Sequence, residues 1–301
     1  MTGKNAESKT CSKFAGSIAI VAALFCSGVQ LQAQAQTADS TIARIKASNK
    51  VKIGVRDFSV PFSYLDANQK PTGYSVELCE AVVESLKKEL NLPSLEVVMQ
   101  SVDLSTRIPL IQNATIDMEC GSTVNTLTRQ RQVDFSYVTA VASDQLLVKA
   151  SSSIKELEDL AGKVVALPNA STSLAMLTSI NNKKHLNMRL MSVRDQAEGF
   201  LAVQTGRADA YITDNTILYG LRKDAKNPAE FRITGRPLSY LPYGIMVAKN
   251  NSTLLAIINR TIAEKFRNGD GKVMYDKWFG QLNMPLSPLT KAAFDINAIP
   301  E

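Results

Sequence analysis

The hydrophobic pattern along the chain predicts short strands that alternate with helices. Apolar residues between Leu78 and Leu90 recur at helical spacing until Pro93 ends the pattern, and short apolar runs bounded by polar residues are typical of buried strands. The predicted strands cover residues 51–55, 95–99, 116–120, 146–148, 163–167, 188–192, 208–212, 231–234 and 243–248. The predicted helices cover residues 42–46, 78–90, 105–113, 155–160, 195–205, 254–266 and 272–279, with a further helix from about residue 126 and an irregular tail after residue 279.

This alternation falls into two blocks, which indicates an α/β protein of two lobes. We expect residues 36–140 to form the first part of lobe 1, residues 144–240 to form lobe 2, and residues 244–301 to return to lobe 1. A loose internal echo supports two similar lobes, because residues 112–119 and 204–210 both read as a helix end followed by a strand with an acidic residue at its start.

Residues 105–136 carry the most chemistry in the chain. They read as a short helix, a strand of alternating apolar and acidic residues, a turn at Gly121, and a polar helix. Arg107, Ser122 and Arg129 would then converge beyond the carboxyl end of one strand. Open α/β sheets bind ligands at such an edge, so this stretch is the first candidate for a binding site.

The second block contributes two further candidates. The polar loop at residues 169–173 is suited to the start of a helix, where anions are well received, and it contains Thr172. The predicted strand at residues 208–212 delivers Asp214. Both residues have a simpler interpretation as helix caps. Similarly, Arg129 lies beside Arg131 and could belong to a solvated basic face.

The N-terminal residues have the pattern of a secretory signal peptide. Three lysines precede an apolar run at residues 14–29, and Ala33-Gln34-Ala35 provides the small residues of a cleavage site before Gln36. The run is short for a membrane anchor, and Phe25 directly before Cys26 disfavours a lipoprotein site. We therefore expect residues 1–35 to be removed and the mature protein to be soluble and extracytoplasmic.

Composition narrows the class of function. Of the 301 residues, 45% are hydrophobic, 21% are charged and 6% are aromatic, as in an ordinary soluble globular protein with few stacking surfaces. Loss of residues 1–35 removes three lysines and one glutamate, which leaves 31 basic and 27 acidic residues and a net charge of +4. This mild basicity without a long basic run does not indicate a nucleic-acid partner, but it suits a small anion.

Cysteine and histidine content disfavours metal and covalent chemistry. Cys11 and Cys26 leave with the signal peptide, so the mature chain keeps only Cys79 and Cys120, for which a disulfide is the default in an oxidising compartment. Two buried free thiols are the alternative. His185 is the one histidine and lies among polar residues. We expect no metal, no cofactor and no catalytic residue.

Several motifs in a fixed order resemble one known family. They are Gly54-Val-Arg56, residues 60–64, Gly73-Tyr-Ser75, the run from Arg107 through residues 117–123 to Arg129 and residues 134–136, and residues 206–210 followed by Asp214. Over residues 42–280 the chain resembles the periplasmic polar-amino-acid-binding proteins of ABC importers, in their glutamate/aspartate-binding branch. The resemblance implies a type II periplasmic binding protein fold, with two lobes joined by two crossover strands. It also implies a periplasmic location and an ABC permease of the inner membrane as partner. A monomer is expected because the ligand cleft, rather than a subunit interface, forms the site.

The resemblance further implies roles for individual residues. Arg56 and Arg107 match positions that bind the ligand's side-chain carboxylate, and Arg129 and Thr172 match positions that bind its α-carboxylate. Ser122 and Asp214 match positions that receive the ammonium group. A dicarboxylic amino acid needs cationic and anionic partners in fixed places, and arginine can hold a carboxylate with two parallel hydrogen bonds.

Three positions depart from that family pattern. Val124 and Leu104 stand where threonine and serine are usual, with Ser105 as a substitute for the latter, and Gln196 stands in place of a histidine. All three changes remove polar contacts. They bear on the identity of the ligand more than on the binding fold. Glutamate or aspartate is the first choice, because Arg56 and Arg107 at cleft positions need an anion, and glutamine, asparagine or another polar amino acid or dicarboxylate is the alternative.

Two other classes of function compete with a binding protein. Some relatives with this fold act as dehydratases, and such an enzyme would need a cleft acid or base, for which Asp117 and Glu119 are the nearest carboxylates. A sensory domain would need a transmembrane segment or a receptor partner. We prefer a binding protein without enzymatic activity.

Overall fold

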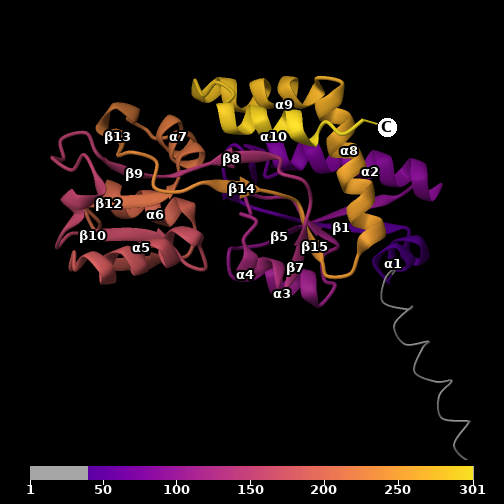
Figure 1. Ribbon diagram of the computed structural model, residues 1–301, viewed down its shortest axis with the longest axis horizontal. Coiled ribbons are helices and arrows are strands. Elements are labelled where there is room, and N and C mark those ends of the chain that lie inside the picture. Colours follow the sequence, from indigo (N-terminus) through magenta and orange to yellow (C-terminus); the bar gives the residue numbers. More distant parts are fainter. Residues whose placement is uncertain (1–39, 301) are drawn as a thin grey trace, which may run out of the picture. The chain divides into compact units, whose positions relative to one another are not determined.

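The described part of the chain, residues 40–300 of a computed structural model, contains two five-stranded sheets (Figure 1). We call the part around the first sheet the first lobe and the part around the second sheet the second lobe. The signal peptide predicted at residues 1–35 lies outside the described residues. Among residues 40–300, no helix has both the length and the apolar character that crossing a bilayer requires.

The first sheet has its earliest strand next to the middle. β1 is parallel to β5 and β6, whereas β15 is antiparallel to β6 and β7. The central position of β6 places the residues that follow it at the middle of one sheet edge. The order across the sheet is β5 (Glu96–Ser101), β1 (Lys50–Val55), β6 (Met118–Glu119), β15 (Met246–Ala248) and β7 (Val133–Phe135).

Helices cover both faces of this sheet. One apolar cluster joins β1 to α2 (Tyr74–Leu90), α8 (Ser252–Arg267) and α9 (Asp270–Phe279). A smaller cluster on the other face joins β7 and β15 to α3 (Arg107–Gln112), near α4 (Leu127–Gln130). Around them lie α1 (Ser40–Ser48) and the small strands β2 (Phe58–Ser59), β3 (Ser63–Leu65) and β4 (Pro71–Thr72).

The second sheet repeats the parallel centre with antiparallel strands added. β10 is parallel to β11 and β12, and β9 is antiparallel to β12 and β13. The order is β11 (Arg189–Val193), β10 (Val164–Pro168), β12 (Ala210–Asp214), β9 (Asp144–Lys149) and β13 (Phe231–Thr234). Alternate β10 residues face α5 (Thr172–Lys184) on one side, and α6 (Gln196–Gln204) and α7 (Asn215–Lys223) on the other.

Two antiparallel strands connect the lobes. β8 (Ala140–Ala142) leads into the second lobe and pairs with β14 (Leu241–Tyr243), which leads back (Figure 1). The sequence predicted one strand over residues 243–248, but the structure divides this stretch into β14 and β15. The break is at Gly244, where a Cβ would lie 3.2 Å from the Ser136 carbonyl oxygen.

The C-terminal region also differs from prediction. The expected irregular tail after residue 279 contains η3 (Gly280–Leu282) and a further helix, α10 (Pro288–Asn297). The Ser287 hydroxyl accepts a hydrogen bond from the Thr290 amide and caps this helix, and Phe294 stacks on Phe266. A serine followed by proline is a helix-start signal that the hydrophobic pattern alone did not capture. The predicted helix at residues 155–160 is the short 3₁₀ helix η1 (Leu157–Leu160), and η2 (Pro228–Glu230) precedes β13.

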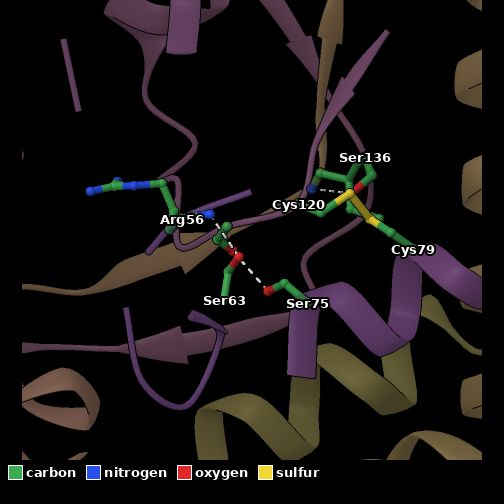
Figure 2. Close-up of a disulfide and its surroundings, with 8 residues drawn as sticks. Arg56, Ser63, Ser75, Cys79, Cys120 and Ser136 are labelled. Atoms are coloured by element: carbon green, nitrogen blue, oxygen red, sulfur yellow. Dashed lines mark hydrogen bonds between the residues drawn. A yellow bond between two sulfur atoms is a disulfide. The ribbon is translucent and has the colours of Figure 1, made fainter. Parts of the chain in front are cut away.

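The disulfide predicted between Cys79 and Cys120 is present, with a Cα–Cα distance of 6.3 Å (Figure 2). It joins α2 to the residue that follows β6, and both half-cystines are buried. The bond therefore fixes the end of the central strand directly before Gly121.

We expect the double variant Cys79→Ala/Cys120→Ala to lose about 3–4 kcal/mol of unfolding free energy, because the bond closes a loop with a sequence separation of 41 residues. Urea unfolding of the mature protein, with and without a thiol reductant, measures the loss. The reductant should lower the midpoint of the parent protein and leave that of the variant unchanged. Equal midpoints for parent and variant would contradict a stabilising role.

Candidate functional site

The residues that follow β6 form a tight, anchored turn. The Ser75 hydroxyl donates to the Gly121 carbonyl oxygen at 2.7 Å, and the Cys120 amide donates to the Gly54 carbonyl oxygen at 2.9 Å. A Cβ on Gly121 would lie 2.2 Å from a Glu119 carboxylate oxygen, so a side chain at this position would have to displace that carboxylate. The turn thus presents Ser122 and Thr123 from a fixed backbone.

Five of the six predicted ligand-binding residues line one small cavity. Its walls come from both lobes, because α3, α4 and the turn after β6 belong to the first lobe, whereas α5 and β12 belong to the second. The cavity has a volume of about 20 Å³, which is room for about one water molecule. The five residues are Arg107, Ser122, Arg129, Thr172 and Asp214.

Arg107 is the largest fully buried side chain of the described residues and is only 1% exposed. Its Nη1 donates to the Thr123 hydroxyl at 2.5 Å, and its buried Nε has no hydrogen-bond partner. Burial, together with the nearby positive charge of Arg129, lowers the pKa of Arg107 to about 9. A cation in such a place is not an ordinary surface arginine, and an anion in the cavity would stabilise it.

Arg129 reaches from the first lobe to the second. Its Nη1 donates to the Val124 carbonyl oxygen at 2.9 Å, and its Nη2 donates to the Ala170 carbonyl oxygen at 3.1 Å. Arg129 is buried, whereas its neighbour Arg131 is exposed, so the interpretation as a solvated basic face is wrong for Arg129.

The start of α5 lies against the same cavity. Ser171 is the N-cap, since its hydroxyl accepts from the Leu174 amide at 3.0 Å. Thr172 is therefore the first helical residue rather than the capping residue, and its hydroxyl is not used for that purpose. The helix N-terminus adds a positive partial charge at this wall, which favours an anionic group.

Asp214 supplies the acidic group of the cavity. It ends β12 at the N-cap position of α7, but its side chain makes no capping hydrogen bond and instead accepts from the Tyr243 hydroxyl. Burial, and then the negative charge of Asp144, raise the pKa of Asp214 to about 7. The simple interpretation as a helix cap is therefore wrong for this side chain.

Arg56 lies at a different cavity. Its side chain follows β1, is 2% exposed and points away from the disulfide (Figure 2). It lines a space of about 470 Å³ together with Asp103 and Asp195. The two cavities are neighbours, because Leu104 and Gln196, the next residues along the chain, line the small one. The Nε and Nη1 atoms of Arg56 are buried without hydrogen-bond partners.

The three departures from the family pattern all face the small cavity. Leu104, Val124 and Gln196 contribute to its walls, and the Gln196 side-chain oxygen accepts from the Tyr211 hydroxyl. Ser105 does not substitute for Leu104, since its hydroxyl donates to the Asp103 carboxylate at 2.6 Å on the exposed side. These positions make the walls less polar than the family pattern implies.

Sequence reasoning did not identify Thr123 and Tyr243, which hold Arg107 and Asp214 respectively. The run Gly121-Ser-Thr contained a signal for Thr123, because a hydroxyl beside a binding turn is a common partner of arginine. Tyr243 carried no signal, since it lies in a crossover strand far from the motifs in sequence. Among residues 40–300, no three His, Cys, Asp or Glu side chains are grouped as a metal site would require.

The cavity combines two buried cations, a helix N-terminus, hydroxyl groups and one carboxylate within a space closed by both lobes. This charge pattern is complementary to a small zwitterion that carries at least one carboxylate and one ammonium group. The titratable groups that line the cavity are two arginines and one aspartate.

Several known proteins are similar to this chain over most of its length. The L-glutamate/L-aspartate-binding protein of Pseudomonas aeruginosa is 40% identical over 280 residues, which cover 90% of this chain and 91% of that protein. The glutamate/aspartate import solute-binding protein of Salmonella typhimurium is 38% identical over 268 residues, or 86% of this chain and 89% of that protein. An ancestral arginine-binding protein solved with bound arginine is 32% identical, with a TM-score of 0.70 over 77% of this chain and 98% of that chain.

The fold seen here is that of the type II periplasmic binding proteins, with two sheet-containing lobes. Residues 51–281 match a single family model, and both curated relatives are transport binding proteins. The chain belongs to the bacterial extracellular solute-binding proteins, family 3.

Proposed function

We propose that this protein captures an acidic amino acid, glutamate or aspartate, between its lobes and delivers it to an ABC permease. The observation that carries this proposal is the fully buried Arg107, whose Nε lacks a partner, in a cavity that also contains Arg129 and Asp214. The names of the two curated relatives support the same ligand class.

The charges suggest how the ligand is held. Arg129 and the amides at the start of α5, beside Thr172, would bind the α-carboxylate, and Asp214 with Ser122 would bind the ammonium group. Arg107 would bind the side-chain carboxylate. Arg56 would share that carboxylate only where the ligand extends toward the larger cavity that Arg56 lines.

Binding requires the lobes to move. The cavity of about 20 Å³ is far smaller than the roughly 300–1,000 Å³ of typical ligand sites, and the hydrogen bond from Arg129, one of its lining residues, to the Ala170 carbonyl oxygen joins the two lobes. We propose that β8 and β14 act as the hinge. In this proposal residues 36–140 and 244–301 form the first lobe, and residues 144–240 form the second. Opening would break the Arg129–Ala170 contact and expose both carboxylate-binding groups.

The remaining parts of the proposal concern location and partners. We propose a periplasmic monomer, exported by a signal peptide at residues 1–35, whose partner is the permease. A neutral relative of the ligand, such as glutamine, is the alternative, because Leu104, Val124 and Gln196 make the walls less polar.

We propose a binding protein rather than an enzyme. Asp117, one of the two carboxylates considered for catalysis, accepts hydrogen bonds from the Arg44 side chain and from the Lys52 amide at 2.8 Å. Asp117 therefore holds the start of β6 in place and does not line the candidate cavity. Unchanged glutamate, measured after prolonged incubation with the protein, tests this part.

The experiment that tests the function is calorimetric titration of the mature, ligand-stripped protein. The ligands are glutamate, aspartate, glutamine, asparagine and a dicarboxylate without an amino group. Tight binding of glutamate or aspartate supports the proposal, and tight binding of an amide alone supports the neutral alternative. An absence of binding to all five would refute amino-acid capture.

We expect Arg107→Met to weaken glutamate binding at least about thirtyfold and glutamine binding much less, because it leaves the side-chain carboxylate buried without its partner. Arg129→Met should weaken both ligands, since both have an α-carboxylate. Arg131→Met is the matched control, because Arg131 is exposed beside Arg129. Equal losses for glutamate and glutamine in Arg107→Met would remove Arg107 from the side-chain site.

We expect affinity for the amino acid to rise between pH 5 and pH 7 and to level off above pH 7. Because the pKa of Asp214 is raised to about 7, the ligand-free protein holds a proton that the ammonium group must displace. The dependence should approach tenfold per pH unit below pH 7. The groups that act on Asp214 are Asp144, Tyr243, Arg107 and Arg129.

The same raised pKa stabilises the ligand-free fold at low pH, and this contribution is lost as the pH rises through about 7. Titrations in buffers of different ionisation enthalpy measure the proton release directly. Asp214→Asn should bind more weakly and without the pH dependence. A pH-independent affinity in the parent protein would contradict the role of Asp214.

A further inference from the structure

Glu119 is a buried carboxylate that lies behind the cavity and does not line it. It is the second residue of β6, between Met118 and Cys120. Those two neighbours face the apolar cluster with α2, and successive strand residues point to opposite faces. Glu119 therefore faces the side of the sheet that carries α3 and α4, from which Arg107 and Arg129 extend.

Glu119 has no ordinary partner within the described residues. Its side chain is 0% exposed, and both carboxylate oxygens are buried without a hydrogen bond. One of them, Oε1, lies 2.2 Å from where a Cβ of Gly121 would be, and the Arg56 Cγ lies 3.0 Å from the same point. The carboxylate is thus packed beneath the glycine turn, beside the stem of Arg56.

The three buried arginines provide the opposite charge. Burial lowers the pKa of Arg56 and of Arg129, and Glu119 is the strongest charge that opposes this shift at each. At Arg107, burial and Arg129 lower the pKa, and Glu119 is again the strongest opposing charge. A buried carboxylate without hydrogen bonds is costly unless cations surround it, so Glu119 and the arginines stabilise each other.

We propose that Glu119 is a positioning residue. Its charge determines which net charge of the ligand the closed cleft binds best. Glu119 offsets one of the positive charges of Arg56, Arg107 and Arg129, and an ionised Asp214 offsets a second. Asp57, Asp103 and Asp195 also act on Arg56 from the side of the larger cavity. The cleft with Glu119 therefore favours a less negative ligand than the same cleft without the Glu119 charge. This inference rests on the proposed function and acts through the arginines, not through contact with the ligand.

Removal of the Glu119 charge should shift selection toward more negative ligands. Glu119→Gln keeps the shape and makes the net charge of the site more positive by one unit. We expect its preference for glutamate over glutamine to rise about tenfold relative to the parent protein, by Coulomb attraction at partly screened distances. A ligand with a net charge of −2 at pH 8, O-phosphoserine, should gain relative to glutamate.

The controls separate charge from structure. Glu119→Asp keeps the charge and should keep the parental preference, even if it binds more weakly. Glu96→Gln removes an exposed carboxylate on β5 of the same sheet and should change neither ratio. Equal weakening of glutamate and glutamine in Glu119→Gln would show a purely structural role and overturn the proposal.

A ligand-free measurement tests the pairing independently. In a double-mutant cycle, Glu119→Gln should lower the urea midpoint less in Arg107→Met than in the parent protein, because the carboxylate has then already lost a cation. Additive shifts would overturn the pairing. If the parent protein bound no amino acid, the proposed function and the selection by charge would both fail, whereas a non-additive cycle would still support the pairing.

Discussion

Burial of arginine in the space between two lobes is the constraint on which the rest of the site depends. Arg107 and Arg129 have lost most of their contact with water, and burial lowers the pKa of both. Neutral oxygen atoms lie at fixed places around them, such as the Thr123 hydroxyl and the Val124 and Ala170 carbonyl groups, and the carboxylates of Glu119 and Asp214 oppose the lowering of both pKa values. The buried Nε atom of Arg107 still has no hydrogen-bond partner, so the cleft favours an anion.

The fold makes this burial possible by fixing one short piece of backbone. The disulfide from Cys79 to Cys120, the pairing of β6 between β1 and β15, and the Ser75 hydroxyl all hold the turn at Gly121. Above the turn lie Ser122 and Thr123, and beneath it lies the Glu119 carboxylate. A shift of this turn would therefore move the Ser122 and Thr123 hydroxyls and the Glu119 carboxylate together.

The second lobe completes the site with groups of the other kind. It contributes the N-terminus of α5 and the Asp214 carboxylate, and the crossover strand β14 contributes the Tyr243 hydroxyl that holds Asp214. A ligand with both charges can thus bridge the lobes, with its carboxylate ends favoured by the arginines and its ammonium end by the aspartate. In the proposed function, this division of charge would link capture of the ligand to closure of the lobes.

Much of the fold and of the candidate site could be predicted from the sequence. The spacing of hydrophobic residues, the residues at turns and the number of cysteines can all be read directly from the chain. They determined the two α/β blocks, the pair Cys79 and Cys120, and five candidates that do line one cavity. Only the tertiary structure decided that Arg56 lines a neighbouring cavity, that Arg129 spans the lobes, and that Glu119 lies unpaired beneath the turn. Those facts depend on side-chain direction and on contacts between distant segments, which no local pattern specifies.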